Sequence, residues 1–83
     1  MKIIYFAKIR EIIGKSEEDI EISSDIETVD NLLDYLISLG ERYEMALYDK
    51  DSIHVACDED HVKKDFKIKD KKEIEIIPTV PGG

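Results

Sequence analysis

The sequence has few of the residues on which disulfide-bonded or membrane-embedded proteins depend. Cys57 is the only cysteine among 83 residues, so no intramolecular disulfide can form. It lies in an apolar run, where a buried structural thiol is commoner than a reactive one. No stretch approaches the roughly 18 apolar residues of a membrane span, and the apolar run at the N-terminus is too short for a signal peptide. We therefore expect a cytoplasmic protein that does not bind membranes.

Basic residues are also scarce. Lysine and arginine together number 12, against 20 aspartates and glutamates, and the formal net charge is −8. An acidic surface repels phosphate backbones, so we do not expect nucleic-acid binding. The charge leaves two interpretations open, a basic partner surface or simple solubility.

Familiar catalytic and metal-binding patterns are missing as well. There is no glycine-rich phosphate loop, and no serine or cysteine has an identifiable base partner. His54 and His61 could join Cys57 and Asp58 in a metal cluster, but their spacing matches no standard zinc pattern. We therefore expect no metal and no bound cofactor, and a stand-alone enzyme is the least favoured class.

What the sequence does contain is a set of alternating strands. We predict strands at residues 2–7, 19–22, 53–57 and 73–76, and a short edge strand near His61 and Val62. In the first strand, Ile4 and Phe6 share one face while Ile3 and Tyr5 share the other. A short helical or irregular stretch at 8–13 stops at Gly14, and residues 41–52 are expected to form a polar loop.

The clearest predicted element is a helix over about 29–39. Thr28 is a good N-cap, and Gly40 is a natural stop. The helix has one apolar face, made by Val29, Leu32, Leu33, Leu36 and Ile37. One such face needs one sheet to cover it. The sequence therefore predicts the α+β class and a β-grasp (ubiquitin-like) fold, with a mixed four- to five-stranded sheet on one main helix and parallel first and last strands at its centre.

A distinct segment follows the last strand. We predict a domain at 1–77 and a flexible, extended tail at 78–83, where two prolines precede Gly82 and Gly83. Without Cβ atoms, the two glycines can lie flat in a narrow channel. Adenylation would turn the unhindered carboxylate of Gly83 into an acyl phosphate that a sulfur or amine nucleophile can attack. A disordered terminus without function is the alternative.

Both ends of the chain resemble a known family. Residues 6–14 resemble the F-A-x-x-R-E-x-x-G signature of the small subunit of molybdopterin synthase, a ubiquitin-like sulfur carrier of the MoaD/ThiS type. Residues 70–83 resemble that family's ending, which finishes in G-G. Four positions depart from the pattern. Lys71 stands where the family usually has glycine, Thr79 replaces a proline, Pro81 replaces a small residue, and Asp58 stands where asparagine is frequent.

The resemblance implies a reaction cycle. An ATP-dependent, E1-like activating enzyme would adenylate Gly83, and a sulfur donor would convert it to a thiocarboxylate. The tail would then deliver sulfur to cyclic pyranopterin monophosphate inside the large subunit of molybdopterin synthase, which would supply the catalytic side chains. ATP would be used by the activating enzyme and not held by this chain.

The strand pattern also predicts a partner-binding surface. Phe6 and Ile77 fall on the sheet face opposite the helix, and Val80 and Pro81 extend the apolar character into the tail. Isolated surface hydrophobes are the alternative. Two other functions remain open. One is a sulfur carrier for thiamine or tRNA thiolation, or a ubiquitin-like protein modifier. The other is a non-covalent ubiquitin-like interaction domain.

Overall fold

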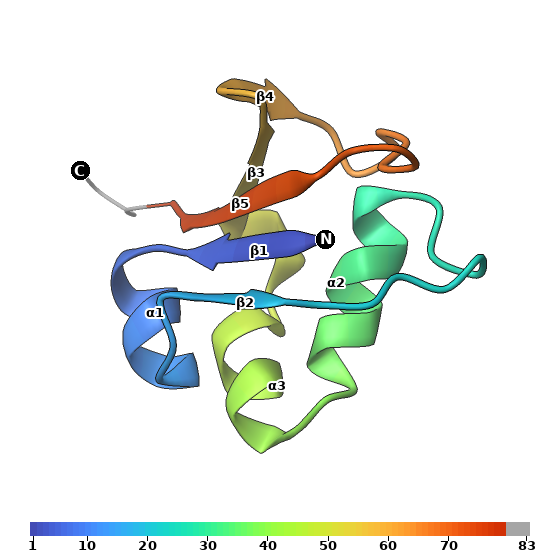
Figure 1. Ribbon diagram of the computed structural model, residues 1–83. Coiled ribbons are helices and arrows are strands. Elements are labelled where there is room, and N and C mark those ends of the chain that lie inside the picture. The colour runs from blue at the N-terminus through green and yellow to red at the C-terminus, as the bar shows by residue number, and fades with distance from the viewer. Residues whose placement is uncertain (80–83) are drawn as a thin grey trace.

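The computed structural model describes residues 1–79, which form one mixed five-stranded sheet with helices on one face (Figure 1). The strand order is β2-β1-β5-β3-β4, with β1 parallel to β5 and the other pairs antiparallel. This confirms the predicted fold class and the parallel pairing of the first and last strands. The elements are β1 (Lys2–Tyr5), α1 (Ala7–Ile13), β2 (Glu17–Asp19), α2 (Val29–Ile37), α3 (Glu41–Leu47), a 3₁₀ turn (Lys50–Ser52), β3 (Ile53–Cys57), β4 (Asp60–Val62) and β5 (Glu73–Pro78).

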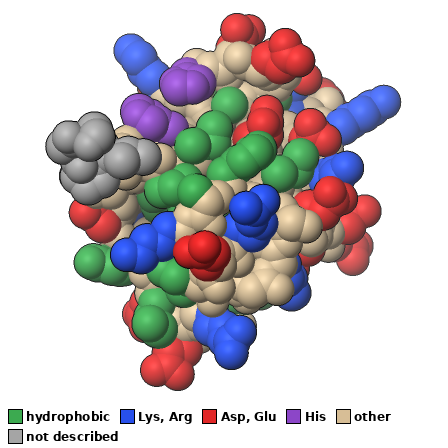
Figure 2. Space-filling view, turned by 90° about the vertical axis from the view of Figure 1, so that its left-hand side faces the viewer, with side chains coloured by type: hydrophobic (Ala, Val, Ile, Leu, Met, Phe, Trp, Pro, Cys, Tyr) green, Lys and Arg blue, Asp and Glu red, His purple; other side chains and the backbone are tan. Residues whose placement is uncertain are grey.

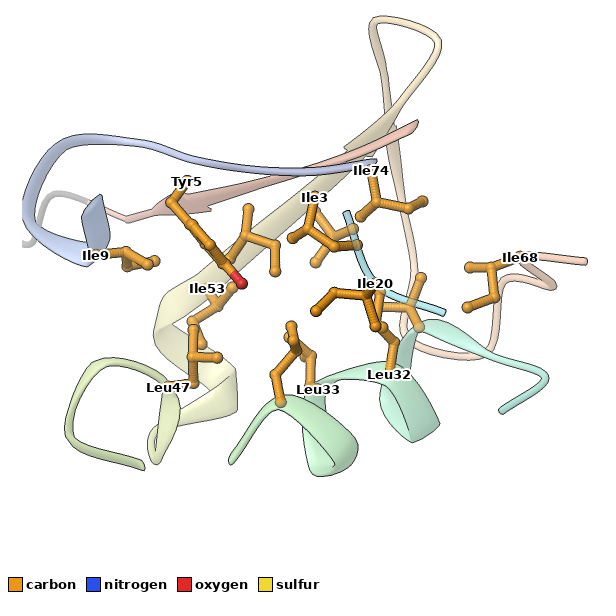
Figure 3. Close-up of a cluster of buried hydrophobic side chains, with 14 of the residues drawn as sticks. Ile3, Tyr5, Ile9, Ile20, Leu32, Leu33, Leu47, Ile53, Ile68 and Ile74 are labelled. Atoms are coloured by element: carbon orange, nitrogen blue, oxygen red, sulfur yellow. The ribbon is translucent and has the colours of Figure 1, made fainter. Parts of the chain in front are cut away.

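The core lies between the sheet and the helices. In β1, Ile3 and Tyr5 are buried while Ile4 is half-buried, as the alternation predicts. Figure 3 shows inward side chains of the sheet facing Leu32 and Leu33 of α2. The core residues with no exposed surface are Ile3, Val29, Leu32, Leu33, Leu36, Leu47, Ile74 and Ile76. The inner face of the sheet is thus fully covered.

Helix α2 begins where its cap predicts and ends slightly early. The Thr28 hydroxyl accepts a hydrogen bond from the Asn31 amide, and the Asn31 side chain accepts from the Thr28 amide. This reciprocal pair satisfies amides that have no partner within the helix. The helix ends at Ile37, two residues before the predicted end, and the predicted stop at Gly40 is wrong. Gly40 instead precedes α3 with an extended backbone, φ 165°.

Two further predictions are corrected. Residues 41–52 are not a loop, because they contain α3 and the 3₁₀ turn. Leu47 of α3 has no exposed surface, so burial of this side chain stabilises a helix too short to persist alone. The ladder of β2 also lies earlier than predicted, at Glu17–Asp19. Ile20 is buried just beyond the last pair with β1, where its amide donates to the Met1 carbonyl at 2.8 Å and its carbonyl accepts from the Met1 amino group at 2.9 Å.

A polar cluster centred on Glu18 joins β1, β2 and α3. Its carboxylate accepts hydrogen bonds from Tyr5 Oη at 2.7 Å, Tyr43 Oη at 2.6 Å and Lys15 Nζ at 3.0 Å. Partial burial alone would raise the pKa of Glu18, but these three hydrogen bonds outweigh it and lower the pKa below its usual value. Burial and the same carboxylate raise the pKa of Tyr5, so both partners keep their hydrogen-bonding forms at neutral pH.

Candidate functional site

The candidate site is the end of β5 from which the tail leaves. Pro78 is the last residue of β5 and pairs with Ile53 of β3. Thr79 then donates two hydrogen bonds to the Ser52 carbonyl oxygen, one from its amide and one from its hydroxyl, each 2.8 Å long. The start of the tail is therefore tied to the sheet through Thr79. The predicted site residues Val80, Pro81, Gly82 and Gly83 lie outside the described residues.

Phe6 and Ile77 occupy adjacent positions at this end of the sheet. The pairing of Tyr5 with Ile76 makes Phe6 and Ile77 the next row, and the Phe6 amide donates to the Ile76 carbonyl at 3.1 Å. The backbone of Phe6 is extended, so its side chain faces away from the helices, as predicted. Both side chains are half-buried rather than fully exposed. Their role in partner binding stays a prediction.

The outer face of the sheet continues from this row toward β3 and β4. His54 pairs with Ile77 in the register, which places the histidine on the same face. Figure 2 shows hydrophobic side chains gathered next to the two histidines of the chain, His54 and His61. No helix covers this face in Figure 1. Among the residues that the structure describes, this is the sheet surface on which a partner can lie.

The motif at residues 6–14 forms the turn that follows β1. Ala7 has a positive φ of 49°, and this sharp change of direction starts α1 directly after the outward-facing Phe6. The helix ends at Gly14, which has φ 85° and donates its amide to the Arg10 carbonyl at 2.8 Å. The side chains of Arg10 and Glu11 are exposed. The structure therefore explains the motif through its backbone, at the turn of Ala7 and at the left-handed Gly14.

A groove beside the tail was not predicted from the sequence. It has a volume of about 410 Å³ and lies between α1, α3 and the end of β5. Met45 and Tyr48 line it and are 58% and 74% exposed. The prediction missed it because residues 41–52 were expected to form a loop. The spacing of Tyr43 and Leu47, four residues apart, was the available signal for α3.

The residues weighed for metal binding are only partly brought together. Cys57 is 4% exposed and belongs to the core, where burial and then the nearby Asp58 raise the pKa of its thiol. His54 and His61 are exposed on the other face, with ring centroids 5.2 Å apart. Within residues 1–79, no three histidine, cysteine, aspartate or glutamate side chains form a metal-binding group. The four-residue cluster weighed from the sequence is therefore not assembled.

The described part of the chain has no helix that is long and apolar enough to cross a membrane.

Comparison with known proteins identifies the family. The ThiS family matches residues 3–83. A Dictyostelium discoideum protein named molybdopterin synthase sulfur carrier subunit is 34% identical, over 99% of this chain and 94% of its own length. A Pyrococcus furiosus structure assigned as molybdopterin converting factor, subunit 1, is 28% identical with a TM-score of 0.74, and covers 95% of each chain.

Two further structures show the same fold. They are of small archaeal modifier protein 1 from Haloferax volcanii, at 22% and 20% identity and TM-scores of 0.74 and 0.73. The alignments cover 100% and 96% of this chain, and 98% and 97% of the archaeal chains. At this identity they support the β-grasp arrangement alone. The whole-length matches settle the family: the chain belongs to the ThiS family of ubiquitin-like sulfur carriers.

Proposed function

We propose that this chain is the sulfur-carrying subunit of molybdopterin synthase and works through the carboxylate of Gly83. The observation that carries the proposal is the 34% identity, over 99% of the chain, to a relative named molybdopterin synthase sulfur carrier subunit. The Gly82-Gly83 ending suits the same role, because a chain without Cβ atoms fits a narrow active-site channel.

The proposed chemistry has two steps on the tail. An E1-like activating enzyme uses ATP to adenylate the Gly83 carboxylate, with release of pyrophosphate. A sulfur donor then supplies sulfide, whose sulfur attacks the acyl carbon. The C–S bond forms as the bond to the phosphate oxygen breaks, AMP leaves, and the product is a thiocarboxylate. In the large subunit, this sulfur is transferred to cyclic pyranopterin monophosphate.

The described residues support a role as carrier. The start of the tail is tied to β3 through Thr79, so the residues that follow leave from a defined point on the sheet. The half-buried Phe6 and Ile77 lie beside that point and would contact the large subunit or the activating enzyme. The buried Cys57, with its raised pKa, is a poor alternative sulfur carrier. Use of ATP and a reduced sulfur donor agrees with the cytoplasmic location that the sequence predicts.

The test is intact-mass spectrometry of the chain after incubation with the activating enzyme, ATP and a sulfide source. Conversion to the thiocarboxylate adds about 16 Da, because sulfur replaces one oxygen. The gain should require ATP and should be absent when Gly83 is deleted. Cys57→Ser is the matched control, because it removes the only thiol and should leave the gain intact.

Three results would contradict the proposal in different ways. Absence of the mass gain, with another carrier loading normally in parallel, would favour a non-covalent interaction domain. Loading without transfer to cyclic pyranopterin monophosphate, in the presence of the large subunit, would favour a carrier for thiamine or tRNA thiolation. Covalent attachment of the loaded chain to lysines would favour a protein modifier.

A further inference from the structure

We propose that His54 and His61 form a two-histidine binding site for a divalent transition-metal ion on the outer face of the sheet. The two imidazole rings lie 5.2 Å apart between centroids, with their planes inclined by 31°. Two imidazoles bound to one tetrahedral ion, with metal–nitrogen bonds of about 2.0–2.1 Å, have ring centroids about 5 Å apart. The centroid separation of His54 and His61 therefore equals that of two imidazoles bound to one ion.

The hairpin of β3 and β4 places the two rings next to each other. His61 pairs with Ala56, and His54 lies two residues before Ala56 on the same strand, so the histidines are diagonal neighbours on one face. A two-residue loop joins the strands directly after the Cys57–Asp60 pair. A ligand pair on a short, rigid hairpin loses little conformational entropy when it binds an ion.

The surroundings also favour a cation. Ala56, which pairs with His61 on one side and Glu75 on the other, contributes only a methyl group to this face, so no large side chain stands at that position. The chain carries a net charge of −8, and this field attracts positive ions. Both histidines are exposed, so an ion can reach them without rearrangement of the core.

The ligand chemistry selects the kind of ion. Imidazole binds Cu²⁺, Ni²⁺ and Zn²⁺ well, and among these divalent ions Cu²⁺ binds most tightly to a given nitrogen site. Within residues 1–79 no third histidine, cysteine or acidic side chain completes a group with this pair. Water would then occupy the remaining positions, so the site is an open, exchangeable one. It is independent of the proposed reaction at Gly83.

The test uses the full-length chain and Cu²⁺ as the probe. Calorimetric titration should give one ion per chain, and each of His54→Ala and His61→Ala should weaken binding by at least about tenfold, because one ligand no longer chelates. Electron paramagnetic resonance of the bound Cu²⁺ should show two coordinated nitrogens in the wild type and one in each variant. Zn²⁺ should perturb the NMR signals of both rings.

Deletion of Gly82 and Gly83 is the control for binding at the tail, and it should leave the affinity unchanged. Bound ion should also raise the thermal midpoint of the wild type more than that of either histidine variant. Wild-type affinity in either single variant would overturn the proposal, because one histidine would then suffice. A stoichiometry of half an ion per chain would also overturn it, since the ion would bridge two copies.

Discussion

The two faces of the sheet differ in how completely their side chains are covered. On the inner face, the helices cover Ile3 and Ile74, which have no exposed surface, and the carboxylate of Glu18 accepts three hydrogen bonds. In residues 1–79, no buried side-chain nitrogen or oxygen lacks a hydrogen-bond partner. On the outer face, Phe6 and Ile77 are only half-buried and the two histidines are exposed.

This difference links the stability of the fold to the inner face and the proposed partner contacts to the outer face. A small domain has a modest total stability, so substitutions among its core residues are costly whichever partner the protein binds. The outer face is free of that constraint, and it is also the face next to the start of the tail. Substitutions on the two faces should therefore have different consequences.

The largest contrast is expected between Leu33→Ala and Phe6→Ala. Leu33 has no exposed surface, so its truncation should lower the free energy of unfolding by about 3 kcal/mol. Phe6 is half-buried, and its truncation should cost about 1 kcal/mol or less. The same Phe6 variant should weaken binding to the molybdopterin synthase large subunit by at least about tenfold. Urea unfolding and calorimetric titration measure the two effects.

The control for this contrast is a combined variant. Because the two positions lie on opposite faces, their effects on stability should add. Equal losses of stability from the two single substitutions would show that the outer face is part of the core. Unchanged binding in Phe6→Ala would remove Phe6 from the proposed partner surface.

A smaller effect, dependent on pH, is expected at Glu18. Its pKa is lowered in the folded protein, so its carboxylate stabilises the fold above its ordinary pKa, and this contribution is lost as the pH falls through the lowered value. Glu18→Gln should therefore cost about 1–2 kcal/mol at pH 7 and less at about pH 3. Urea unfolding at both pH values measures the change.

Glu17→Gln is the matched control for this prediction. Glu17 is exposed and forms an ion pair with Lys2 at 3.2 Å, with both side chains about half exposed. Such pairs contribute little, so the substitution should change stability by less than about 0.5 kcal/mol. A cost at Glu18 that does not shrink toward low pH would mean that the charge of Glu18 is not what stabilises the cluster.

Much of the fold was predictable because burial on one side of an element leaves a regular apolar pattern in its sequence. The apolar face of α2 and the alternation in β1 and β5 follow directly from burial on one side. Helix α3 was missed because seven residues carry too little periodicity, and its stability depends on the burial of Leu47. Lys71 stands where the family usually has glycine, and the positive φ in this turn, 70°, belongs to the preceding residue, Asp70.

The candidate site was predictable only in part, for a related reason. Alternation along each strand placed Phe6 and Ile77 on the outer face, and the register confirms that they are neighbours. The approach of His54 and His61 depends instead on the pairing of β3 with β4, which no local pattern specifies. The two histidines are seven positions apart in sequence, and the two-residue loop brings them together.

The smallest expected effect is at that loop. Asp58 and Glu59 both have positive φ, 54° and 71°, as the two central residues of a type I′ hairpin loop require. Residues with a Cβ are strained there, whereas glycine is not. Glu59→Gly should therefore raise the free energy of unfolding by about 0.5–1 kcal/mol, even though glycine also increases the entropy of the unfolded chain. Urea unfolding at neutral pH measures the gain.

Glu11→Gly is the matched control, because it makes the same chemical change at an exposed position inside α1. There the backbone is helical, no strain is relieved, and glycine should lower the free energy of unfolding by about 1 kcal/mol. The two substitutions remove the same charge, so their opposite signs isolate the backbone conformation as the cause. A loss of stability at both positions would mean that the hairpin accommodates Glu59 without strain.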